Sequence, residues 1–65
     1  MTYKTYHVFT NEMDEWFDDK KDAVELYNEW KKENGCARLY EEVREKSSDE
    51  VIDENCIKSF GAWPL

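Results

Sequence analysis

The sequence predicts a small α+β domain in which one helix packs across one face of an antiparallel sheet of three or four strands. Three observations predict this fold. Residues 2–10 are rich in Thr, aromatic and β-branched side chains, residues 20–34 carry a helical apolar stripe, and residues 36–44 alternate between apolar and polar side chains. The chain has 65 residues, which is enough for one domain over residues 1–65 and leaves no room for a second.

The first strand is expected over TYKTYHVFT, residues 2–10. Apolar side chains stand at both odd and even positions, so both faces of the strand carry apolar groups. This pattern suits an inner strand better than an edge strand. A polar turn at residues 11–14 follows, and Glu15 to Phe17 can run back beside the first strand as a short arm.

The helix prediction rests on agreement between a start signal, an apolar stripe and a stop signal. Asp18 or Asp19 can cap the free backbone N–H groups at the start. Gly35 is placed to take the left-handed conformation that ends a helix. The stripe has the spacing of one helix face and consists of Ala23, Leu26, Tyr27 and Trp30.

After Gly35 the period changes to that of a strand with one buried and one solvated face. The side expected to be buried carries Ala37, Leu39 and Val43, and the other carries Arg38, Tyr40, Glu42 and Arg44. A return strand is expected over residues 50–59, with a bulge that resets its alternation. Folding the hairpin about residues 47 and 48 places Val43 near Ile52, Leu39 near Cys56, and Cys36 opposite Ser59.

An apolar core of large side chains is expected from this arrangement. Its members are Val8 or Phe9, Phe17, Leu26, Tyr27, Trp30, Leu39, Val43 and Ile52. Domains of this size end near the margin of stability, so dimerisation would be a natural supplement.

Composition excludes several classes of function. The chain holds 16 acidic and 9 basic residues, a formal net charge of -7, which disfavours direct nucleic-acid binding and anionic membrane surfaces. No segment approaches the roughly 20 apolar residues of a membrane span, and the N-terminal residues 1–10 lack the apolar stretch of a signal peptide. We therefore expect a cytoplasmic protein with reduced thiols at Cys36 and Cys56.

No catalytic, cofactor or metal site is expected. His7 is the only histidine, and neither a partner nor a pocket for it can be identified, so it is interpreted as a structural strand residue. Two isolated cysteines and one histidine fall short of a structural zinc site. The acidic run from Asp14 resembles a calcium loop only in its acidity, because Asp19 stands where such a loop needs Gly.

Negative charge is concentrated in two blocks. Residues 1–19 hold one Lys against five acidic residues, residues 20–34 hold four of each, and residues 35–65 hold four basic against seven acidic residues. In an antiparallel fold the two acidic blocks can converge on one side. Two interpretations stay open: a solvated face that keeps the protein soluble, or a patch complementary to a basic protein surface.

Aromatic side chains near the acidic blocks are candidate anchors for a protein partner, because Trp and Tyr are common at interfaces. Each of them can instead pack within the fold. For Trp63 in the C-terminal tail neither interpretation is favoured, because chain termini are often loosely held. The candidate partner-binding set is Asp14, Glu15, Trp16, Tyr40, Glu42, Asp49, Glu50, Asp53, Glu54 and Trp63.

Three segments, LYNEW at 26–30, ARLYEEV at 37–43 and NCIKSFGAWP at 55–64, together resemble small acidic proteins of tailed bacteriophages. The resemblance implies a protein made in the cytoplasm of an infected bacterium that binds a host or phage protein and alters its activity. Some acidic phage proteins act as DNA mimics by occupying nucleic-acid-binding surfaces.

The leading expectation is a non-enzymatic binding protein, a modulator or inhibitor that occupies a basic surface of a larger host protein. The alternative is a structural or assembly component that homo-oligomerises through a strand edge or through the Trp63 tail. A small enzyme using His7 or a cysteine is disfavoured for want of a second catalytic group.

Overall fold

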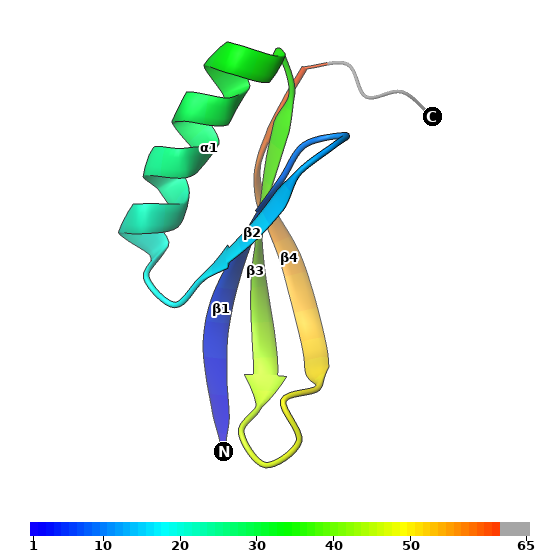
Figure 1. The fold of residues 1–65 in the computed structure, drawn as a ribbon. Helices are drawn as coiled ribbons and strands as arrows, with labels where there is room; N and C mark the ends of the chain where they lie inside the picture. The colour runs from blue at the N-terminus through cyan, green and yellow to red at the C-terminus, as the bar shows by residue number, and fades with distance from the viewer. Residues whose placement is uncertain (62–65) are drawn as a thin grey trace.

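The computed structural model describes residues 1–61, and these form one sheet and one helix (Figure 1). The elements are β1 (Thr2–Phe9), β2 (Asp14–Phe17), α1 (Lys20–Asn34), β3 (Ala37–Glu45) and β4 (Val51–Phe60). The strand order is β2-β1-β3-β4, and every neighbouring pair is antiparallel. The predicted α+β class is confirmed. The inner position expected for the first strand is also confirmed, and the short arm after the first turn is a strand.

Helix α1 begins and ends where its sequence signals predict. The Asp19 side chain accepts a hydrogen bond from the Lys21 backbone N–H at 2.8 Å, which makes Asp19 the N-cap. Gly35 adopts φ 74°, and its N–H donates to the Lys31 carbonyl, which closes the helix. Asp22 in the first turn and basic residues in the last turn match the helix dipole.

The core lies between α1 and the sheet face that it covers. Val8, Ala23, Ala37 and Leu39 are fully buried, and Tyr27 is nearly so. Burial raises the pKa of the Tyr27 hydroxyl. The partly buried side chains packed against this centre are Tyr6, Phe17, Val24, Leu26, Trp30 and Ile57.

Of the alternatives Val8 and Phe9, Val8 is the core member, and Phe9 projects from the opposite side of β1, because successive strand residues alternate between faces. Two expected core members lie elsewhere. Val43 is only half-buried and lies outside the core cluster. Ile52 is 56% exposed. The turn end of the β3–β4 hairpin extends away from α1 (Figure 1), so the helix does not cover the segments that carry Val43 and Ile52.

The register of the hairpin follows the prediction only beside the turn. Arg44 lies opposite Val51, which agrees with a turn centred on residues 47 and 48, but Val43 lies opposite Asp53 and Leu39 opposite Lys58. Likewise, Tyr40 rather than Leu39 faces Cys56, and Arg38 rather than Cys36 faces Ser59. The two register shifts in β4 each displace the pairing by one residue. The predicted bulge is confirmed, and a second bulge accounts for the remaining error.

Both edges of the sheet carry features that hinder strand pairing with other chains. Edge strand β2 is four residues long. Edge strand β4 is exposed at every residue except Ile57, but two bulges interrupt it and Asp53, Glu54 and Lys58 place charges along it. Short, bulged and charged edges are the usual protection against edge-to-edge association. Within residues 1–61 no helix has the length and apolar character needed to cross a membrane.

Candidate functional site

The sheet face turned away from α1, called the open face below, carries a row of polar and aromatic side chains. Residues directly opposite one another in antiparallel strands project to the same face. One row across the sheet therefore consists of Trp16, His7, Tyr40 and Cys56. The neighbouring row consists of Asp14, Phe9, Arg38 and Ser59. Towards the hairpin turn follow Thr5, Glu42 and Glu54, then Tyr3, Arg44 and Val51. The open face thus contains five of the aromatic or imidazole rings of the described residues.

Four of these rings form a contiguous cluster. The His7 and Trp16 rings stack with centroids 4.1 Å apart and planes 5° from parallel. Phe9 lies 4.8 Å from His7, and Tyr40 lies 5.4 Å from Phe9. Trp16 is still 47% exposed. The cluster therefore presents ring surface to solvent while its members hold one another in place.

Glu42 is buried beneath the open face, with 6% of its surface exposed. Its Oε1 accepts hydrogen bonds from Arg44 Nη2 at 3.0 Å, Trp16 Nε1 at 3.1 Å and Thr5 Oγ1 at 3.3 Å. Arg44 also donates to Thr5 Oγ1 and to the Asp49 carbonyl. A buried carboxylate needs such donors, so this network fixes the orientation of the Trp16 indole and of the Arg44 guanidinium.

His7 lies between two carboxylates. Its Nε2 is 3.7 Å from Asp14 Oδ2, and its Nδ1 is 3.9 Å from Glu42 Oε2. Both distances exceed a hydrogen bond, and the buried Nε2 atom has no hydrogen-bond partner among the described residues. The ring is instead held by its aromatic neighbours. Residues 1–61 contain no cluster of three His, Cys, Asp or Glu side chains that could hold a metal ion.

The turn end of the open face is tied together by Tyr3 and Asp49. The Tyr3 hydroxyl donates to the Asp49 carboxylate, which raises the pKa of Tyr3. Asp49 has φ 60°, a left-handed conformation that Asp tolerates in turns. The contact joins the first strand to the β3–β4 turn.

The structure brings part of the predicted partner-binding set together. Asp14, Trp16, Tyr40, Glu42 and Glu54 share the open face, and Asp49 lies at its turn end. Of these, Glu42 is buried, because the side chains of Trp16 and Arg44 cover it. Glu15 and Asp53 project to the helix side, because they lie opposite Val8 and Val43. Glu50 is exposed in the turn, and Trp63 lies outside the described residues.

Sequence reasoning missed the contribution of β1 to this surface. Tyr3, His7 and Phe9 stand at odd positions of one strand, so their shared face was visible in the alternation. The sequence did not show which side of β1 the helix would cover. It also did not single out the ion pair between Arg44 and Glu42, although the two residues stand two apart on the same face of β3.

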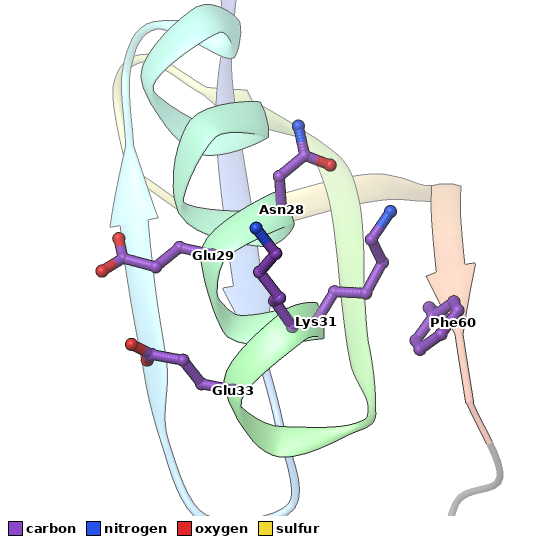
Figure 2. A pocket seen from close by; sticks show the side chains of 6 residues that line it. Asn28, Glu29, Lys31, Glu33 and Phe60 are labelled. Atoms are coloured by element: carbon purple, nitrogen blue, oxygen red, sulfur yellow. The ribbon is translucent and has the colours of Figure 1, made fainter.

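A second feature is an open hollow of about 620 Å³ between the outer side of α1 and the end of β4 (Figure 2). Its lining consists of Asn28, Glu29, Lys31, Lys32, Glu33 and Phe60. Lys31 Nζ lies 5.4 Å from the centre of the Phe60 ring, a cation–π contact. Figure 2 shows Glu29 and Glu33 directed away from Phe60. The lining holds two lysines and two glutamates, so its formal charges cancel.

Comparisons of the chain with protein-family models, with curated proteins and with solved structures find no match.

Proposed function

We propose that this protein is a non-enzymatic binding module that uses its open face to occupy a basic surface of a larger protein. One observation carries the proposal: the aromatic cluster of His7, Phe9, Trp16 and Tyr40 lies on a sheet face that α1 leaves uncovered, with carboxylates around it. Contiguous exposed apolar surface rimmed by polar groups is typical of interaction sites.

The composition of the open face resembles that of a protein interface. Trp and Tyr are enriched among residues that dominate binding energy. Trp16 is held by its ring stack on His7 and by its indole hydrogen bond to Glu42. Ordering this side chain on binding would therefore cost little conformational entropy.

Charge favours a basic partner. The carboxylates of Asp14, Glu42, Asp49 and Glu54 on and beside this face outnumber the guanidinium groups of Arg38 and Arg44. The whole chain has a formal net charge of -7, which repels nucleic acid and accelerates encounter with a positive surface. Occupying a surface that normally holds nucleic acid would make the protein an inhibitor of that partner.

The experiment is capture from a bacterial lysate on immobilised protein at low and high salt, followed by mass-spectrometric identification. The variant Asp14→Asn/Tyr40→Leu alters the open face, and Glu25→Gln on the exposed side of α1 is the control, with the same loss of charge. We expect a basic protein that is released by salt, lost with the open-face variant and retained by the control, because exposed ion pairs are screened. Affinity that does not change with salt, or equal capture by both variants, would contradict the proposal.

Homo-oligomerisation through a strand edge is the second candidate function. The exposed side chains of Val51, Ile52 and Phe60 along edge strand β4 favour it. Its bulges, its charges and the repulsion between two copies of the same acidic chain oppose it. Light scattering across a range of protein concentrations distinguishes the two functions, since a monomer at high concentration excludes this one.

A further inference from the structure

We propose that the open face recognises arginine side chains of the partner, with Trp16 and Asp14 as the receiving pair. This inference rests on the proposed function and names the chemical group that the face selects. Trp16 and Asp14 stand two residues apart on β2 and project to the same side. A guanidinium stacked on the indole can therefore reach the carboxylate of the second residue.

The aromatic component of this pair is already ordered. His7 stacks on one side of the Trp16 ring at 4.1 Å, while 47% of Trp16 remains exposed. A cation over the face of an indole is attracted by the ring quadrupole, and Arg is the cation most often found there. Because Glu42 Oε1 accepts the indole N–H, the ring cannot turn freely and offers a fixed platform.

Among the described residues, the acidic component has no ion pair with a lysine or an arginine. The Asp14 side chain is 56% exposed, and its nearest basic group is His7 Nε2 at 3.7 Å, beyond hydrogen-bond distance. Glu42 differs, because Arg44 already occupies it at 3.0 Å. Asp14 therefore retains acceptor oxygens for a guanidinium, which matches a carboxylate with two parallel N–H donors.

Arg44, one of the two arginines on the open face, shows how this face holds a guanidinium. Arg44 donates through Nε, Nη1 and Nη2 to Thr5, the Asp49 carbonyl and Glu42. Its planar fork of donors suits the acceptors that the strands present. An ammonium group lacks both the flat stacking surface and the fork, so lysine should bind less tightly than arginine.

Neither a second copy of the chain nor nucleic acid fits this pair as well. Two copies would bring acidic faces of the same sign together, and phosphates would approach an exposed carboxylate. An arginine-bearing protein surface satisfies both the ring and the carboxylate.

The test is an NMR titration of the full chain at low ionic strength with three peptides of equal length, containing three arginines, three lysines or three citrullines. We expect the arginine peptide to shift the Trp16 indole N–H signal and the Asp14 amide, and to bind about two- to fivefold more tightly than the lysine peptide. Citrulline, which is flat but neutral, should bind most weakly. Asp14→Asn should reduce arginine binding by about two- to fivefold, whereas Glu25→Gln on α1, with the same loss of charge, should not.

The outcomes separate this inference from the proposed function. Equal binding of arginine and lysine peptides on the open face overturns arginine selection and leaves a general basic partner in place. Shifts confined to other parts of the protein, or no shift with either peptide, overturn both. The Trp16→Leu variant removes the indole and should abolish the preference for arginine. If that variant does not fold, the comparison of peptides still decides the question, because it needs only the unmodified chain.

Discussion

Removal of the Arg44 guanidinium should destabilise the fold strongly, because it leaves the Glu42 carboxylate buried without its counterion. We consider Arg44→Met, which keeps an unbranched apolar side chain and removes the guanidinium. Breaking a buried ion pair by removing one partner costs about 3–5 kcal/mol. Glu42 keeps the donors of Trp16 and Thr5, and the Arg44 side chain is 23% exposed. We therefore expect about 2–3 kcal/mol, a large part of the about 3–10 kcal/mol typical of a chain this size.

The coupling between the two residues gives a sharper test than either substitution alone. Glu42→Gln keeps the shape and removes the charge, and should cost about 1–2 kcal/mol. The double variant should cost at least about 1 kcal/mol less than the sum of the two, because each single change leaves the remaining partner without its counterion or with a weaker hydrogen bond, and that loss is counted twice in the sum.

Urea unfolding followed by far-UV circular dichroism measures these differences, with Lys32→Met on the exposed side of α1 as a control expected within about 0.5 kcal/mol of the parent. Thermal midpoints should fall by about 10–20 °C for Arg44→Met, from about 4–8 °C per kcal/mol in small domains. Additive costs, or an Arg44→Met cost below about 0.5 kcal/mol, would show that the pair behaves as a surface ion pair and would refute the reasoning.

Three further predictions concern caps, turns and titration. Asp19→Ala should lower thermal stability by about 1 kcal/mol, because the helix loses its N-cap acceptor. Gly35→Ala should cost about 1 kcal/mol from its positive φ alone, and Gly61→Ala should cost more, because a Cβ at φ 86° would lie 2.2 Å from the Gly35 carbonyl oxygen. Tyr3→Phe should remove a late component from the alkaline absorbance titration, since the hydrogen bond to Asp49 raises the pKa of Tyr3 above its usual 10.0.

Each of these predictions has a matched control or a contrary outcome. Asp18→Ala removes an acidic residue beside the cap and should leave stability nearly unchanged. Equal effects of alanine at Gly35 and Gly61 would contradict the close approach at Gly61. For Tyr3 the raised pKa stabilises the fold below the unfolded value and is lost as the pH rises through the folded value. Stability that falls equally with pH in the parent and in Tyr3→Phe would contradict the contact.

Local signals predicted the elements of this fold well. Asp19, the apolar stripe on α1 and Gly35 each act over a few residues, and each has the role expected of it. The alternation in β3 predicted the burial of Ala37 and Leu39. These features depend on backbone hydrogen bonding and on side-chain period, which sequence records directly.

The features that sequence could not supply depend on how separate segments meet. Two bulges in β4 moved Cys56 and Ser59 from their expected partners, and bulges leave little trace in a strand rich in charge. Ile52 was expected in the core because it is apolar, but it lies where the hairpin extends away from α1. Glu42 was expected on a solvated face, yet the Arg44 and Trp16 side chains cover it.

Because Glu42 is buried and paired with Arg44, the negative charge that the open face presents to a partner comes from other residues. The Glu42 carboxylate is matched by Arg44 near the inner strands, so the unmatched acidic groups lie on edge strands, Asp14 on β2 and Glu54 on β4. Rim charges mainly affect the association rate, whereas desolvated central contacts govern dissociation. Glu54→Gln should therefore lower the salt dependence of association with the partner, while Tyr40→Leu at the centre should speed dissociation. A partner whose association rate is indifferent to both salt and Glu54 would have to bind another surface of this protein.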